Sequence, residues 1–579
     1  MNVQRASFMS VVVVQAGGGP ASVDRFPPPV TVPATATPTA ADLAITPAVL
    51  RAPIRFLADD LLEGRGPGTR GDRIARAYVA SCFEMLGLQP GNGAGGWEQD
   101  FDLVGVTTRS PANWRFAARD GRVELADRRD FVAVAGAIPA AAIDGRPTAI
   151  EFGPAEVVFV GYGIEAPEFG WDDFKGVDVR GKVLLVLNDD PDWDPALFAG
   201  KRRLYYGRWT YKFENAARHG AAAAILIHTD ASAGYPWQTV VTSWSGENSR
   251  LAGGTGPEVD VQAWITEDAA RRVTATGGHD LDALVHSARS RDFSPVALGI
   301  RTALRVQAAA RTDRTANVLG LLPGSDPALR TEVVILTAHH DHLGTKTGGD
   351  RPGEVYNGAL DNAAGVAQLL AVARAFGSLP RAPRRSVLFL ATAAEEQGLL
   401  GSSYYARHPT FPAGRIAANI NFDGGNVWGR TTDALAIGFG KSSLDAVASA
   451  SARRQGRTYG DEPFPEKGSF YRSDQLNFAR IGVPALFLRT GIDFVGRPPG
   501  WGAEQAERWT QEHYHQPSDD FDPTWDLEGM VDDARLGFAI AEAVAEAPAM
   551  PTWNPGDEFE AARRAALSDT AGPEGSPSE

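Results

Sequence analysis

Residues 332–344 of the chain read EVVILTAHHDHLG. A short continuous apolar run that ends abruptly in polar residues is typical of a strand buried within a mostly parallel sheet. Three of the chain's 10 histidines fall within positions 339–342, directly after this run. In open α/β sheets, ligand sites form outside the carboxyl ends of the strands, so we expect a functional site here. On this segment alone, His339, His340 and His342 compete as the ligating residue.

Apolar runs that predict strands alternate with helical patterns through the rest of the chain, from Thr315 to Ala547. The segments are residues 362–379, 384–398, 399–408, 415–425, 482–491 and 526–547. Buried strands that alternate with helices predict an α/β fold with three αβα layers, in which helices cover both faces of a mostly parallel central sheet.

Ionisable residues follow each of these predicted strands. Glu395 and Glu396 follow the second strand, Asp423 closes the third, and the sequence HYH at residues 513–515 precedes the last helix. Asp361 stands at the start of a helix, where a simple N-cap is the alternative interpretation. Taken singly, the paired glutamates also fit an acidic helix start, and the aspartate after the third strand also fits a turn.

Together these residues form a ligand set for metal ions. Histidine nitrogens combined with carboxylate oxygens suit zinc, with cobalt or manganese as alternatives. Two ions about 3.5–4 Å apart suit amide hydrolysis, and one of two adjacent glutamates can then serve as general base. Asp341 follows His339 by two positions, and Asp519 lies close after His515. Each carboxylate is a candidate partner for the free ring nitrogen of its histidine.

The ordered motifs AHHDH, ALDNAAG, AAEEQGLLGS, INFDGG and YHQPSDD resemble those of the co-catalytic zinc exopeptidases of metallopeptidase family 28. The resemblance covers roughly residues 315–547 and is specific, because five motifs occur in the family's order with fitting intervals. It implies a phosphorylase/hydrolase-like zinc peptidase domain that binds two Zn²⁺ and cleaves the N-terminal peptide bond of peptide substrates.

The resemblance also implies which residues bind the metals. The implied ligands are His339, Asp361, Glu396, Asp423 and His515. His339 and Asp423 would bind one ion, Glu396 and His515 would bind the other, and Asp361 would bridge the two. In relatives the peptide bond after the bridging residue is often cis, and the matching bond here is Asp361–Asn362.

Four further residues take roles from the same resemblance. Glu395 would be the general base, and Asp341 would orient the histidine two positions before it. Tyr514 matches a tyrosine that stabilises the tetrahedral oxyanion in some relatives. Arg472, within the sequence FYRSDQLNF, matches a segment that lines the site in some relatives.

The rest of the chain is predicted to divide into further segments. Residues 176–189 and 212–230 resemble a protease-associated domain. The predicted organisation is a leader and linker at 1–46, an N-terminal helical segment of the peptidase domain at 47–110, an inserted α/β protease-associated domain at 111–311, the zinc peptidase domain at 312–550 and a flexible tail at 551–579.

Composition narrows the class of protein and its location. The formal net charge of −15 argues against a nucleic-acid partner, which would favour basic patches. No apolar run is long enough to span a membrane. Residues 1–22 resemble a weak secretory signal, which predicts a periplasmic or secreted protein, with a cytoplasmic location as the alternative.

Three other functions fit parts of the same pattern. A carboxypeptidase or dipeptidase would need a cationic pocket for a substrate carboxylate, for which Arg472 and Arg489 are candidates. A glutaminyl-cyclase-like acyltransferase would bind one zinc ion rather than two. A non-catalytic, receptor-like binding protein would be expected to lack metal ligands, whereas none is missing here. An aminopeptidase is the favoured interpretation.

Overall fold

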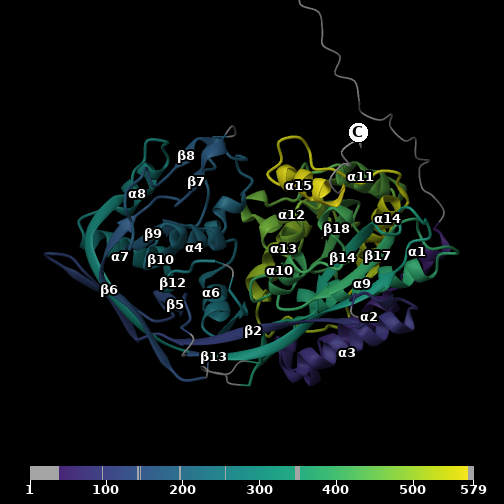
Figure 1. Ribbon diagram of the computed structural model, residues 1–579, viewed down its shortest axis with the longest axis horizontal. Helices are drawn as coiled ribbons and strands as arrows, with labels where there is room; N and C mark the ends of the chain where they lie inside the picture. Colours follow the sequence, from purple (N-terminus) through teal and green to yellow (C-terminus); the bar gives the residue numbers. More distant parts are fainter. Residues whose placement is uncertain are drawn as a thin grey trace, which may run out of the picture.

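The computed structural model describes residues 38–571, apart from residues 94, 140–141, 144, 195–196, 255 and 346–352. Figure 1 shows two lobes side by side. We call residues 111–295 the middle lobe, and residues 38–97 together with 323–571 the main lobe. Two long antiparallel strands, β2 (Glu98–Arg109) and β13 (Val296–Leu322), run from one lobe into the other along the bottom of the view. The lobes therefore share continuous strands.

The main lobe contains the predicted sheet. Strands β14 (Val333–His339), β17 (Ser386–Thr392), β18 (Ile416–Phe422) and β21 (Ala485–Thr490) run parallel in the spatial order β17-β14-β18-β21. Antiparallel neighbours flank them, namely the end of β13 beside β17 and β19 (Asp433–Ile437) beside β21, and β20 (Thr458–Asp461) pairs parallel to β19. The sheet is mostly parallel, as predicted.

Helices cover both faces of this sheet. Successive side chains of a strand point to opposite faces, so Val334 packs into one core cluster while Val333 and Ile335 pack into another. The second cluster includes Tyr405 and Phe478, which lie on the helices of the opposite face. The helices of the first face are α1 (Ala40–Ala44), α2 (Pro47–Leu57), α3 (Arg70–Met85), α9 (Ala364–Gly377), α11 (Leu444–Arg454) and α14 (Glu528–Glu546), and those of the second are α10 (Leu400–Arg407) and α12 (Gln475–Arg480). The three αβα layers are therefore confirmed.

The middle lobe has its own α/β sheet. Its strands β6 (Thr148–Phe159), β9 (Val183–Leu187), β10 (Ala223–His228) and β12 (Val261–Thr266) are parallel neighbours, and β5 (Phe131–Ala135) is antiparallel to β12. Its longer helices are α4 (Trp209–Arg218), α6 (Trp237–Trp244), α7 (Glu267–Thr276) and α8 (Leu281–Ala288). The predicted boundary between residues 311 and 312 falls inside β13, which pairs with β6 near its start and with β17 at its end.

The two ends of the chain differ from a simple leader and tail. Residues 1–37 of the predicted leader lie outside the described residues, and α1 already packs on the main lobe, where Arg535 donates hydrogen bonds to the carbonyls of Asp42 and Ile45. The expected flexible tail contains helix α15 (Glu560–Ala571). Trp553 and Phe559 are buried, and Arg563 donates to the carbonyl of Ile416. These apolar anchors hold the segment in place. Within the described residues, no helix is long and apolar enough to cross a membrane.

Candidate metal centre

The predicted ligands meet at the carboxyl edge of the main-lobe sheet. His339 is the last residue of β14, Glu395 and Glu396 follow β17, and Asp423 follows β18 directly. Asp361 precedes α9, and its peptide bond to Asn362 is cis, as the resemblance implies. Because parallel strands end at the same edge, residues far apart in the sequence come together here.

One group of ligand atoms surrounds the ring of His339. Its Nε2 atom lies 3.3 Å from Oδ1 of Asp361 and 3.5 Å from Oδ1 of Asp423. Burial alone would lower the pKa of His339, but the carboxylates of Glu395, Asp361 and Asp423 raise that pKa well above its usual value. The carboxylates thus strongly favour a positive charge at this position.

A second group lies on the other side of Asp361. The Nε2 atom of His515 is 3.4 Å from Oδ2 of Asp361 and 2.9 Å from Oε2 of Glu396. Asp361 therefore presents one carboxylate oxygen to each histidine. This is the geometry expected of a carboxylate that bridges two cations.

The donor atoms of this site fit a pair of metal ions. The Nε2 atoms of His339 and His515 are buried, yet neither makes a hydrogen bond within the part of the chain that the structure describes. Buried polar atoms are normally hydrogen-bonded, so buried ring nitrogens that face only carboxylate oxygens indicate places for cations. Two imidazoles and three carboxylates are ligands that zinc accepts.

The three neighbouring histidines have different surroundings. His340 points away from the site, and its Nε2 atom lies 3.0 Å from Oδ1 of the buried Asp72. His342 lies inside the site, with Nδ1 2.6 Å from Oε1 of Glu396, and it forms a potential ligand group with Asp361 and that glutamate. Sequence reasoning counted His342 as a competitor for the ligand position but gave it no role. The density of histidines was the only signal.

Asp341 supports the site through the backbone. Its carboxylate accepts hydrogen bonds from the backbone N–H groups of Glu395 at 3.1 Å and Glu396 at 3.4 Å. Its Oδ1 atom is 3.8 Å from Nδ1 of His339, which also lies 3.3 Å from the Asp341 carbonyl oxygen. Asp341 thus fixes the loop that carries both glutamates as well as facing the histidine ring.

Glu395 is placed beside the first ligand group. Its Oε2 atom is 4.0 Å from Nε2 of His339, and its side chain is buried. Burial raises the pKa of the Glu395 carboxyl well above its ordinary value, although the nearby charge of His339 opposes this rise. A raised pKa makes a carboxylate a stronger proton acceptor, which suits a general base.

Of the residues expected beyond the metal ligands, Tyr514 and Arg472 both line a cavity that Asp361 and Glu395 also line. Tyr514 stacks on the ring of His515 with centroids 3.9 Å apart, and burial raises the pKa of its phenol. Arg472 lies over the ring of Tyr235 in the middle lobe, at 4.9 Å. Asp519, a predicted partner of His515, instead accepts hydrogen bonds from the backbone N–H groups that lead into Asp361. Its expected role was wrong, because Nδ1 of His515 lies 3.1 Å from Oγ of Ser243.

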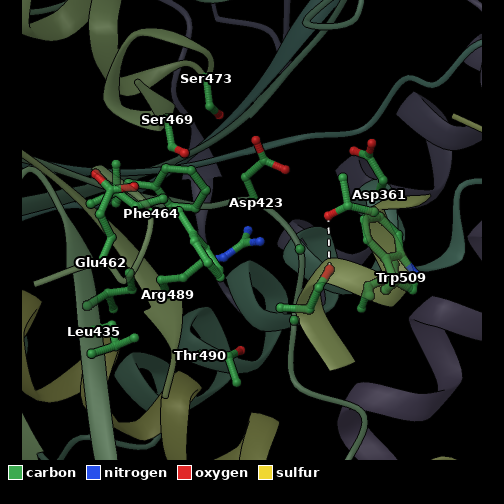
Figure 2. A pocket seen from close by; sticks show the side chains of 18 of the residues that line it. Asp361, Asp423, Leu435, Glu462, Phe464, Ser469, Ser473, Arg489, Thr490 and Trp509 are labelled. Carbon is green, nitrogen blue, oxygen red and sulfur yellow. Dashed lines mark hydrogen bonds between the residues drawn. The ribbon is translucent and has the colours of Figure 1, made fainter. Parts of the chain in front are cut away.

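A cavity of about 220 Å³ opens beside this centre (Figure 2). Asp361, Glu395, Glu396 and Asp423 line one part of it. Much of the remaining wall is apolar and includes Trp428, Leu435, Ile437, Phe464, Phe487, Phe494 and Trp509. Arg489 and Glu462 also line the cavity, and Figure 2 shows both among these residues. The cavity offers an apolar pocket for a substrate side chain next to the ligand groups.

Comparison with known proteins gives the family of this region. Residues 317–539 match the model of peptidase family M28. These residues form a peptidase family M28 domain. All five predicted ligands lie within the M28 domain.

Several relatives are similar over part of the chain. A probable zinc metalloprotease of Pyrenophora teres f. teres is 29% identical over 262 residues, which are 41% of this chain and 52% of that protein. Aminopeptidase YwaD of Bacillus subtilis is 27% identical over 190 residues, which are 32% of this chain and 36% of that protein. The chain thus spans about half the length of the first relative and about a third of the second.

Solved structures are also similar to this chain. An aminopeptidase from Aneurinibacillus sp. strain AM-1 shares 20% identity with a TM-score of 0.49, and the match covers 89% of this chain and 96% of that one. A zinc aminopeptidase from Bacillus subtilis shares 18% identity with a TM-score of 0.45, covering 89% and 97% respectively.

Proposed function

We propose that the chain is a zinc-dependent aminopeptidase that hydrolyses the N-terminal peptide bond of peptides. The observation that carries this proposal is Asp361, whose two oxygens face His339 and His515 at 3.3 Å and 3.4 Å. The M28 domain and the similarity to aminopeptidase YwaD support the same function. His339 and Asp423 would hold one zinc ion, and Glu396 and His515 the other.

The residues around the metals have separate tasks. Two zinc ions at this site would supply Lewis acidity toward the peptide carbonyl and toward water. Glu395 accepts the proton of the attacking water at its carboxylate and returns it to the nitrogen of the leaving amine. Asp341 holds the backbone of Glu395 and Glu396, so base and ligand keep a fixed relative position. In this proposal the phenol of Tyr514 donates to the developing oxyanion.

The cavity gives the substrate its orientation in this proposal. The N-terminal side chain would enter the apolar part of the cavity, which holds Leu435, Phe464 and Phe494. The scissile bond would then lie over Asp361 and Glu395, at the same cavity's wall. Burial of apolar side-chain area is worth about 25 cal/mol per Å², so the pocket would favour substrates with apolar N-terminal residues.

A carboxypeptidase on the same scaffold is the second candidate. Arg489 lines the cavity, and its charge acts on the carboxyl of Glu462 in the same wall. A guanidinium at this place would suit the carboxylate of a substrate.

The test compares peptides with free and acetylated N-termini on the zinc-loaded protein, together with a panel of aminoacyl-nitroanilides. Our proposal predicts turnover of the free-amine substrates and of nitroanilides with apolar residues, and none of the acetylated peptides. Cleavage of acetylated peptides at their C-termini would replace the aminopeptidase by the carboxypeptidase.

A further inference from the structure

The ring of His515 is held from the other lobe of the molecule. Its Nδ1 atom lies 3.1 Å from the hydroxyl oxygen of Ser243, on helix α6 of the middle lobe, 272 residues away in the sequence. The Nε2 atom of the same ring faces Glu396 and Asp361 in the main lobe. The two nitrogens of one histidine therefore connect the middle lobe to the metal centre.

We propose that Ser243 is a positioning residue for the metal ligand His515. A ring nitrogen that binds a metal must be unprotonated, and the proton then sits on the other nitrogen. Nδ1–H donates to Oγ of Ser243, which fixes this tautomer and aims the lone pair of Nε2 at Asp361 and Glu396. The inference rests on the proposed function, because it takes His515 as a zinc ligand.

Helix α6 is a firm support for this contact. Thr239 and Val240 are buried, and the indole N–H of Trp237 donates to the carbonyl of Arg128 at 2.8 Å. At its other end, the ring of Trp244 packs against that of Trp264, with centroids 6.0 Å apart. Ser243 is therefore presented by a helix that is packed into the middle lobe.

The backbone of His515 is strained, and its ring has a hydrogen-bond partner in the other lobe. His515 adopts a φ of 57°, in the left-handed region that non-glycine residues rarely occupy. The nearby carboxylate of Asp519 is engaged by the N–H groups of Leu360 and Asp361. Among the described residues, Nδ1 of His515 has the hydroxyl of Ser243 as its hydrogen-bond partner.

A second contact between the lobes lies next to the other ligand. The backbone N–H of Ser249, on strand β11 (Glu247–Leu251), donates to the side-chain oxygen of Gln397 at 3.4 Å. Gln397 directly follows Glu396. The middle lobe thus touches the segments that carry both ligands of the second ion, so docking of this lobe and binding of that ion favour each other.

The test is a matched pair of substitutions that differ in one hydroxyl. Ser243→Thr keeps the hydroxyl, whereas Ser243→Val replaces it by a methyl group of nearly the same shape. Zinc affinity is measured by competition with a chelator on the full-length chain, and thermal unfolding of the metal-free proteins checks the fold. Loss of an outer hydrogen bond to a ligating histidine typically costs about 10–100-fold in metal affinity.

The expected result is that Ser243→Val weakens one of the bound zinc ions by about 10–100-fold, while Ser243→Thr binds like the unchanged protein. Ser243→Ala repeats the test if the valine variant unfolds. Ser245→Ala is the matched control, because its buried hydroxyl has no hydrogen-bond partner among the described residues. Equal affinities for the threonine and valine variants would overturn the inference.

One further variant separates this inference from the proposed function. His515→Ala should lose the second zinc ion. If it keeps both ions, the proposed metal site itself is wrong. If His515→Ala loses zinc while Ser243→Val and Ser243→Ala retain it fully, the metal site stands and only the role of Ser243 falls.

Discussion

In both lobes of the molecule, acidic residues and histidines stand at or just after the ends of parallel strands. The surroundings of these residues differ between the lobes. In the middle lobe, Asp189 and Asp190 follow β9, and His228 ends β10. Asp190 accepts the backbone N–H of Leu204 at 2.8 Å, Asp189 pairs with Arg203 at 3.0 Å, and Nε2 of His228 lies 3.1 Å from a carbonyl oxygen.

In the main lobe, two histidine nitrogens of the metal centre lack hydrogen-bond partners among the described residues. Nε2 of His339 and of His515 makes no hydrogen bond in the described part of the chain, and each faces carboxylates. Polar residues at strand ends therefore do not by themselves mark a functional site. The mark in the main lobe is a pair of buried histidine nitrogens that face carboxylates from several elements.

The largest expected effect comes from the base. Glu395→Ala should lower kcat by about 10²–10⁴-fold, because the water then lacks its proton acceptor. The zinc content should stay unchanged, since Glu395 is not among the proposed ligands. Steady-state kinetics and zinc analysis on one preparation check both points. A variant that loses its zinc together with its activity would make Glu395 a ligand and remove it as base.

The next effect sets an aspartate of one lobe against an aspartate of the other. Asp361→Asn should abolish tight zinc binding, because the bridge between the two ligand groups loses its charge. Asp190→Asn, at a strand end of the middle lobe, should leave zinc content unchanged and alter only stability. Zinc analysis measures the metal content of both variants, and thermal unfolding measures their stability. Equal zinc content in the two variants would erase the distinction between the lobes.

A smaller effect separates the two residues after His339. Asp341→Asn should weaken zinc binding by about 10–100-fold, because the carboxylate that holds the glutamate loop and faces the histidine loses its charge. His340→Gln should leave zinc affinity unchanged and cost about 1–3 kcal/mol of stability, since its buried partner Asp72 loses an interaction. Chelator competition and denaturant unfolding give the two readouts. The reverse pattern would place His340 in the metal centre.

The smallest expected effect is a pH dependence of stability at the wall of the cavity. Burial raises the pKa of Glu462 to about 7, although Arg202 of the middle lobe opposes this. The folded protein thus holds a proton that the unfolded chain releases at lower pH. This contribution to stability is complete below the unfolded pKa and is lost as the pH rises through about 7.

The side chain of the Glu462→Gln variant does not titrate. Between pH 4 and pH 8, the stability of this variant should therefore rise by up to about 3 kcal/mol relative to that of the unchanged protein. Thermal unfolding at several pH values measures this difference. Glu466→Gln, the same change at an exposed position of the same segment, is the control and should show a constant difference. A constant difference for Glu462→Gln as well would contradict the expected titration.

Local pattern made much of the main lobe predictable. The apolar run before His339 is buried on both faces, and this is why it reads as continuous rather than alternating. Local pattern placed Asp361 and Asp423 at the ends of elements, and the resemblance to family 28 implied their role as ligands. Each of these features depends on a few consecutive residues, and such local features are the easiest to predict from sequence.

Features that depend on contacts between distant segments were not predictable. The choice among His339, His340 and His342 depends on which side of the loop faces the sheet edge, and the sequence carries no periodic signal for it. In the sequence, Ser243 is an ordinary serine of a helix, and its contact with His515, 272 residues away, exists only in the folded chain. Strand β13 crosses the expected domain boundary because its pairing partners come from both lobes.

The central claim is that Asp361 joins two metal sites into one centre. The most direct measurement is a zinc titration of the metal-free protein, with metal analysis at saturation, on the unchanged chain and on His339→Ala and His515→Ala. We expect about two zinc ions per chain for the unchanged protein and about one for each variant. A single ion in the unchanged protein, or none, would contradict it.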